Sequence, residues 1–212
     1  MKLENVTGNI ICKKIKSKHI QRILFMLLVM ILGGLFIGYA VHSITTEHEY
    51  ILPLIAMIFG AVCIIGGIYT ITLSIKVITR VQYSMVFLKY GSPESIAEII
   101  ADGANSSIVS CKQTILTDKF ILKKNDFETF VPLESILLLY KKEHRTNGIL
   151  DSVSLVVHDE YGDDFEYPFK LGKKYEGEFN LAGAEIAKHA PNARFGYTKE
   201  NLAYVKQNAK KV

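Results

Sequence analysis

The stretch "YKKEHRTNG", residues 140–148, holds the densest group of basic and titratable side chains in the second half of the chain. Lys141, Lys142 and Arg145 could contact anionic lipid headgroups or an acidic protein surface. Each basic residue near an anionic membrane contributes roughly 1 kcal/mol, so three would matter for a domain held close to a bilayer. The alternative is a solvated strand end that enters a turn at "NG", residues 147–148.

Catalysis by this stretch would rest on His144 acting as a general base beside Glu143. Adjacent residues on a strand point to opposite faces, which weakens that pairing. The sequence also contains no Ser/His/Asp spacing, Gly-rich phosphate loop or G-x-S-x-G elbow. We therefore expect a protein that is not an enzyme and binds no cofactor.

Two further basic residues, Lys123 and Lys124, lie beside the expected tight turn at Asn125-Asp126. If this turn and the turn near residue 147 lie on one edge of the fold, the two basic groups form a single contact patch. The candidate contact residues for anionic lipid or a partner are then Lys123, Lys124, Lys141, Lys142 and Arg145.

Metal binding has weaker support. His42, Glu47, His48 and Glu49 fall in one short segment and carry ligand atoms that divalent metals accept, although polar residues that cap helices at a membrane surface explain them as well. "DEYGDD", residues 159–164, lacks the spacing of a twelve-residue calcium loop and is expected to be a charged hairpin tip. Because the three cysteines are far apart, neither a zinc site nor a disulfide framework is predicted.

Two long apolar segments place this chain in a membrane. Residues 23–41 carry no charge, and the apolar run of residues 51–75 is interrupted only by Pro53 and three Thr or Ser residues. At roughly 1.5 Å of rise per residue, each segment can cross a hydrocarbon core of roughly 30 Å. We predict a two-pass transmembrane hairpin, with a short outside loop over residues 42–50.

The distribution of Lys and Arg predicts the orientation. Six lie before or at the start of the first span and two close the second, whereas residues 42–50 have none. Both termini are therefore expected in the cytoplasm. Residues 81–212 carry 17 Lys and Arg against 18 Asp and Glu, so the net charge of +4 belongs to the membrane flanks and gives no support for nucleic-acid binding.

Small residues recur at four-residue spacing in both spans, and such faces let helix backbones approach closely. The two helices could pack on each other, or one face could contact a second copy or another membrane protein. Neither span has an ionisable residue in its central stretch, which argues against a transporter or a proton relay. The candidate packing residues are Gly34, Gly38, Gly60 and Gly67.

After the second span, apolar spacing through Leu88 predicts that its helix runs on until "YGSP", residues 90–93. Ser92 and Pro93 then mark the start of a helix over residues 92–103. Short β-like runs follow at 107–117, 119–124, 127–131, 136–142, 152–158 and 165–169. Two further helices end the chain, one from about 175 to 189 and one over 199–210, capped by Thr198.

The segment "TILTDKFILKKNDFETFVPLESILLLYK", residues 114–141, resembles bacterial pleckstrin-homology-like (PH-like) domains. The likeness rests on Leu116–Thr117–Asp118 between two strands and on the corner Val131–Pro132–Leu133–Glu134–Ser135–Ile136. The whole layout is also similar to an uncharacterised family of small membrane proteins of Gram-positive (Firmicute) bacteria. The resemblance implies a bent antiparallel sheet closed by a C-terminal helix, and it brings no catalytic residues.

The expected fold class is α+β, with a small antiparallel barrel or sandwich after the membrane hairpin. The expected division is a cytoplasmic segment 1–19, a hairpin 20–80 with spans at 20–41 and 51–75, connecting helices 81–105, a PH-like domain 106–190 and a C-terminal helix 191–212.

The expected function is that of a scaffold in the cell membrane, which docks a protein or the anionic inner surface of the bilayer. The alternative is an accessory subunit of a transporter or cell-envelope complex that acts through its transmembrane helices. The expected partners are the lipid bilayer, anionic headgroups and a protein, which could be a second copy of the chain.

Overall fold

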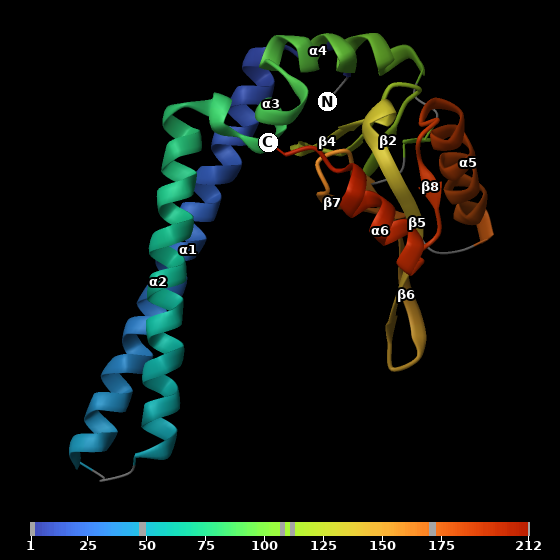
Figure 1. Cartoon of the computed structure of the whole chain (residues 1–212). Helices are drawn as coiled ribbons and strands as arrows, with labels where there is room; N and C mark the ends of the chain where they lie inside the picture. Colours follow the sequence, from blue (N-terminus) through green and yellow to red (C-terminus); the bar gives the residue numbers. More distant parts are fainter. Residues whose placement is uncertain (1–2, 47–49, 107–108, 111–112, 170–172, 212) are drawn as a thin grey trace. The chain divides into compact units, whose positions relative to one another are not determined.

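The computed structural model describes residues 3–46, 50–106, 109–110, 113–169 and 173–211 (Figure 1). The chain divides into two compact units, one formed by residues 15–83 and the other by residues 1–14 together with 84–212. Of the residues expected in the outside loop, Glu47, His48 and Glu49 lie outside the described part, as does Cys111.

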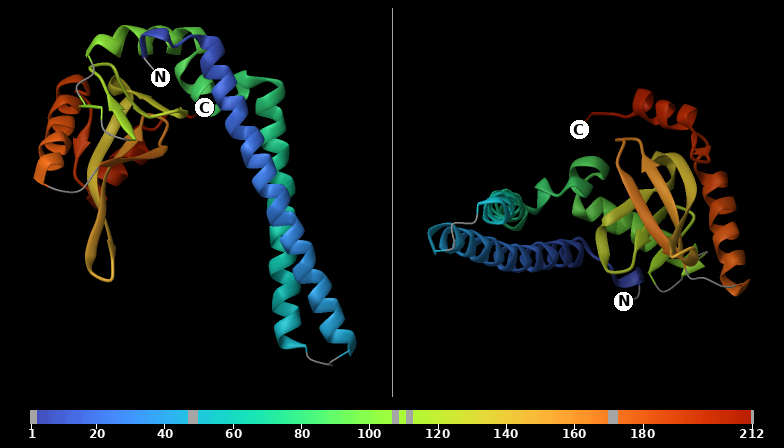
Figure 2. Two further views of the ribbon diagram at one scale, coloured as in Figure 1. Left: turned by 180° about the vertical axis from the view of Figure 1, so that it is seen from behind. Right: turned by 90° about the horizontal axis from the view of Figure 1, so that it is seen from below.

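The first unit is a pair of antiparallel helices, α1 (Gly8–Thr46) and α2 (Ile51–Thr79), which run side by side in Figures 1 and 2. Both are long and apolar enough to cross a membrane, and only 11% and 17% of their most apolar stretches are buried within the chain. Their remaining apolar side chains face outward, as a lipid environment requires. These helices associate the protein with a membrane.

Small residues bring the two helices together. Pro53, Gly60, Gly67 and Ser74 are buried in α2 at seven-residue intervals, the repeat that keeps one seam of a helix against its partner. A Cβ atom on Gly60 would lie 2.5 Å from the carbonyl oxygen of Gly33, so side chains are excluded there. Gly33 therefore contacts α2, whereas a Cβ atom on Gly34 or Gly38 would have no neighbour within 4 Å, so these two glycines face away.

The connection after α2 differs from the continuous helix expected. The helix does extend beyond Ile75, but it ends at Thr79, because Arg80 leaves the helical region at φ −134° and ψ 88°. A 3₁₀ turn η2 (Val81–Tyr83) and a separate short helix α3 (Met85–Tyr90) follow. The apolar spacing read from the sequence thus belongs to two helical segments, with Ser84 extended between them.

In the second unit, α4 (Pro93–Asp102) begins as predicted, with the backbone N–H of Ser95 donating to the hydroxyl of Ser92. Two four-stranded sheets follow. The first has the order β1-β2-β3-β4, and the second has the order β7-β6-β5-β8. The strands are β1 (Val109–Ser110), β2 (Thr114–Leu116), β3 (Phe120–Lys123), β4 (Asp126–Pro132), β5 (Ile136–Thr146), β6 (Ile149–Asp159), β7 (Asp164–Phe169) and β8 (Arg194–Phe195).

The described strands do not close into the barrel that was one of the two expected forms. The 3₁₀ corner η4 (Leu133–Ser135) sends the chain from the first sheet into the second. Where β2 and β7 meet, the Thr114 hydroxyl donates to the carbonyl of Pro168 over 3.0 Å, in place of a backbone ladder. Proline has no N–H to donate to a neighbouring strand, and among the described residues no backbone ladder joins β2 to β7.

The core lies between the sheets and is covered by α5 (Lys173–His189), whose Ala182 and Ile186 are fully buried, as their helical spacing predicted. The last helix, α6 (Lys199–Asn208), packs through Val205 on Leu137 and Leu138. Its predicted cap is confirmed, since the N–H of Asn201 donates to the Thr198 hydroxyl over 3.1 Å. The short parallel strand β8 was not expected.

The packing of the glycines gives a first prediction. Gly60→Leu should destabilise the helix pair by about 1–3 kcal/mol, because the new side chain collides with the backbone of α1. Gly34→Leu is the matched control and should leave the pair unchanged. Thermal unfolding of the full-length protein in detergent micelles measures both; equal effects would contradict the assigned interface.

Candidate functional site

A buried ion pair joins α3 to the turn between β6 and β7. The side chain of Lys89 is 2% exposed, and its Nζ lies 2.8 Å from Oδ2 of Asp159, which is fully buried, and 2.6 Å from Oδ2 of Asp163. Buried charges are stable only when they are paired and hydrogen-bonded, so this contact fixes where α3 lies on the sheets.

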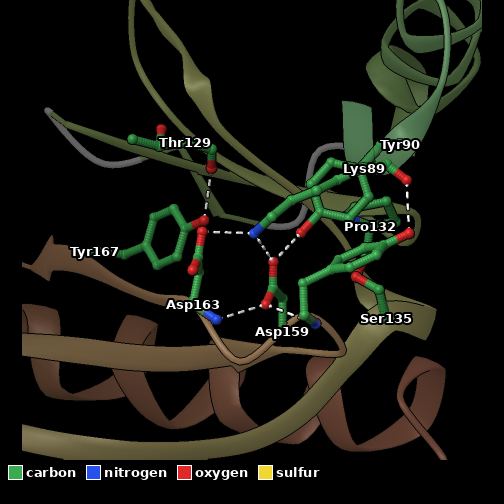
Figure 3. Close-up of polar contacts among 9 residues, drawn as sticks. Lys89, Tyr90, Thr129, Pro132, Ser135, Asp159, Asp163 and Tyr167 are labelled. Atoms are coloured by element: carbon green, nitrogen blue, oxygen red, sulfur yellow. Dashed lines mark hydrogen bonds and ion pairs between the residues drawn. The ribbon is translucent and has the colours of Figure 1, made fainter. Parts of the chain in front are cut away.

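Asp159 accepts further hydrogen bonds, as Figure 3 shows. The Tyr90 hydroxyl donates to Oδ2 over 2.6 Å, and the backbone N–H groups of Tyr161 and Asp163 donate to Oδ1 over 3.0 and 2.9 Å. The Tyr161 hydroxyl donates in turn to the carbonyl of Lys89 over 2.7 Å. Asp159 therefore shapes its own turn while it holds the lysine.

Two tyrosines in this region stay protonated. Burial and the negative charge of Asp159 raise the pKa of Tyr90 far above its usual value. Burial also raises the pKa of Tyr167, whose hydroxyl donates to the carbonyl of Thr129 over 2.6 Å. Both hydroxyls act as hydrogen-bond donors within the fold, and the cluster positions elements.

A pocket of about 420 Å³ lies beside this cluster, lined by Lys89, Tyr90, Ile99, Pro132, Glu134, Ser135, Glu160 and Lys210. Several of its polar groups already have partners within the chain. The Ser135 hydroxyl donates to the carbonyl of Pro132 over 2.8 Å, and Nζ of Lys210 lies 2.5 Å from Glu160. Among the described residues, no group of three or more His, Cys, Asp or Glu side chains could hold a metal ion.

The sequence predicted a charged hairpin tip at residues 159–164 and missed the buried pair. Asp159 followed by Tyr161-Gly162 does signal an aspartate that caps its own turn. Nothing in the sequence indicated that Lys89, 70 residues earlier, lies opposite it.

The basic stretch at residues 140–148 lies on a long β-hairpin, which projects beyond the rest of the second sheet in Figures 1 and 2. The strand expected to end at Lys142 continues to Thr146, because pairing with β6 holds it to the turn. Asn147 and Gly148 make that turn with φ of 52° and 81°, the two positive values of a type I′ hairpin. The stretch is therefore mostly strand.

Each basic side chain of this hairpin has an acidic neighbour. On one face, Lys141 and Arg145 lie 2.9 and 2.8 Å from Glu143. On the other face, Lys142 lies 2.9 Å from Glu166 of β7, which His144 also contacts. His144 and Glu143 thus have separate partners, in agreement with their expected opposite orientation.

Glu166 lies on β7, beside the hairpin, and its pKa is strongly lowered. Burial alone would raise its pKa, but hydrogen bonds from Lys142, Ser154 and His144 outweigh burial and lower the pKa to about 2.

The other two basic candidates lie in the first sheet: Lys123 ends β3, and Lys124 lies in the turn between β3 and β4. This turn and the turn of the β5–β6 hairpin therefore do not share a sheet edge. Whether either basic group contacts lipid or a partner stays a prediction.

The outer side of β5 is open along most of its length. β8 pairs with β5 only at Leu138 and Leu139, and Gly196, at φ 92°, then turns the chain away. From Tyr140 to Thr146, no strand in the described part of the chain pairs with this side, which we call the free edge. A groove of about 270 Å³ begins beside it, lined in part by Leu139, Phe179 and Phe195.

The other sheet edges are protected. β7 carries Pro168 at its end, and Pro132 ends β4, whose Phe130 packs edge-on against Tyr90 of α3. In the described part of the chain, β1 spans two residues. Short strands, prolines and covering helices are the usual means of preventing edge-to-edge pairing. The free edge of β5 is therefore the candidate docking site.

No protein-family model, curated protein sequence or solved structure matches this chain.

The buried pair gives a second prediction. Lys89→Met should lower the free energy of unfolding by about 3–5 kcal/mol, because it leaves the buried carboxylate of Asp159 without its cation. Lys119→Met is the matched control, since Lys119 pairs with Asp102 at the surface and its loss should leave the free energy of unfolding nearly unchanged. Urea unfolding of the full-length protein measures both, and similar losses would contradict the structural role of Lys89.

The lowered pKa of Glu166 gives a third prediction. Its stabilising contribution is fully present above about pH 4.5, the usual pKa of the group, and is lost as pH falls towards 2. Because the side chain is about one-third exposed, we expect Glu166→Gln to cost about 1 kcal/mol at neutral pH. Urea unfolding at several pH values should show this difference vanish between pH 4.5 and 2; a difference independent of pH would contradict it.

Proposed function

We propose that this protein is a membrane-anchored, non-enzymatic docking protein that binds a protein partner along the free edge of β5. One observation carries the proposal: the β5–β6 hairpin extends past β8 on one side and past the end of β7 at Phe169 on the other, so that among the described residues its tip is a two-stranded ribbon. Two-stranded ribbons are marginally stable in water, and a third strand from a partner would complete the sheet.

The charges of the ribbon support specific docking. Lysines on an edge strand discourage indiscriminate pairing, because an apolar strand that pairs there would remove their charges from water without compensation. Lys141 and Arg145 share a single acid, Glu143, so this row retains one excess positive charge. A strand with matching charges is accepted, and an apolar strand is rejected.

The two apolar helices support the anchoring half of the proposal. With both termini in the cytoplasm, the sheets would be held at the inner surface of the membrane. Tethering raises the effective concentration of a docking surface, so weak contacts suffice. The paired antiparallel sheets and the covering α5 are the elements that the PH-like resemblance implied, and we propose that the second unit is a binding domain of that kind.

Site-specific photocrosslinking in cells tests this function. Benzoylphenylalanine at Thr146, on the free edge, should give a discrete protein adduct. The same probe at Lys188, exposed on α5, should give none. Gly148→Pro should disrupt the hairpin turn. Loss of the protein adduct in this variant would support edge docking.

Two other results would overturn the proposal. Adducts to lipid alone would assign the hairpin to the anionic membrane surface. A partner that remains bound to the Gly148→Pro variant but is lost on Gly34→Leu, Gly38→Leu would favour the accessory-subunit alternative. Gly34 and Gly38 suit that alternative because they face away from α2.

A further inference from the structure

We propose that the strand completing the free edge is β5 of a second copy of this chain, paired antiparallel about a two-fold axis at His144. The inference rests on the proposed docking function and names its partner. It follows from the backbone directions along β5, the order of its charges and the place where β8 ends.

The backbone fixes which residues face the free edge. The N–H of Gly196 donates to the carbonyl of Leu139 over 3.0 Å, so the polar groups of Leu139 point to the outer side of β5. The backbone N–H and C=O groups of successive strand residues point to alternate sides, so the backbone polar groups of Lys141, Glu143 and Arg145 also point outward. The irregularity near His144 skips a residue of β6, so β5 itself continues regularly.

The charges on these residues are self-complementary in one register. With His144 opposite His144 of the second copy, Glu143 faces Arg145 of the second copy, and the symmetry makes this contact twice. Opposite charges on directly facing strand residues attract, and like charges repel. A register centred on Glu143 would instead place Lys141 opposite Arg145, which is repulsive.

The position of β8 excludes the remaining attractive register. Centring the pair on Lys142 would set Glu143 opposite Lys141, but it would also bring Arg145 opposite Leu139, where β8 already pairs. The register centred on His144 pairs residues 142–146 of each copy, all of them within the free edge, and sets Lys141 opposite Asn147 of the hairpin turn. It also brings the hairpin turn beside Tyr140 of the second copy.

Exposed apolar side chains lie on the ribbon face that this register brings together. Ile149, opposite Thr146, is 71% exposed at the hairpin tip, and Tyr197, 65% exposed, packs against Tyr140 with ring centroids 4.8 Å apart. Both lie on the face that carries Tyr140 and Thr146. The second copy would give each an apolar neighbour, in addition to the backbone ladder.

Charge exchange tests the partner and the register together. Glu143→Arg sets Arg145 opposite an arginine, and Arg145→Glu sets Glu143 opposite a glutamate, so each single variant should weaken dimerisation at least about tenfold. The double variant restores both pairs and should dimerise like the native chain. Single-molecule photobleaching of labelled full-length protein in liposomes measures the dimer fraction, and circular dichroism checks folding.

Disulfide formation between copies tests the symmetry independently. In a background with the three native cysteines replaced by serine, His144→Cys should give an oxidised dimer, because the residue faces its own copy. Lys142→Cys and Thr146→Cys should each give little dimer alone, but a mixture of the two should crosslink. Crosslinking of Lys142→Cys with itself would overturn the register.

The outcomes distinguish this inference from the proposed docking function on which it rests. A chain that is monomeric in liposomes, yet gives a discrete adduct to another protein at Thr146, overturns the second-copy partner and leaves edge docking in place. A monomer with no protein adduct at Thr146 overturns both. If both single variants and the double variant dimerise to the same extent, the contact lies elsewhere in the chain and the inference is overturned.

Discussion

A lysine and an aspartate removed from water constrain the second unit more than any other contact. Lys89 comes immediately before the end of α3, and Asp159 ends β6, so their ion pair joins the beginning of this unit to its central hairpin. The pair fixes the position of α3, because a displaced α3 would leave each charge buried without the opposite charge. Tyr90 and Tyr161 add directional hydrogen bonds, which an apolar contact could not supply. In this position, α3 covers β4 and closes one edge of the first sheet.

Once α3 has closed that edge, the sheets differ in how they are protected. Pro132 ends β4, Pro168 is the second-last residue of β7, and β8 covers only the beginning of β5. The projecting half of β5 relies on charge alone. Charge protects an edge from apolar strands, and in the proposed pairing the same row of side chains, Lys141, Glu143 and Arg145, would also select the partner strand.

Local patterns in the sequence predicted the elements well, because caps and alternation are properties of neighbouring residues. Ser92 and Thr198 begin helices as expected, and the strands at 119–124, 127–131 and 165–169 lie within a few residues of their observed bounds. Contacts between distant residues could not be predicted in this way. The pair of Lys89 with Asp159, the parallel strand β8 and the contact of His144 with Glu166 all depend on how the sheets fold together. The glycines show the same limit: the spacing indicated close packing, and only the geometry shows that Gly33 contacts α2 while Gly34 faces outward.

Pro168 has a consequence for the size of any assembly that forms through β5. A sheet extended across two copies would run from β7 of one to β7 of the other, so its two ends would be identical. Each end carries a residue that cannot donate to a further strand. The two-fold arrangement also uses up both β5 edges at once, whereas a head-to-tail contact would leave one exposed and could grow into a filament. Pro168 would thus make the proposed pairing self-limiting, so the chain could use an open strand for recognition without polymerising.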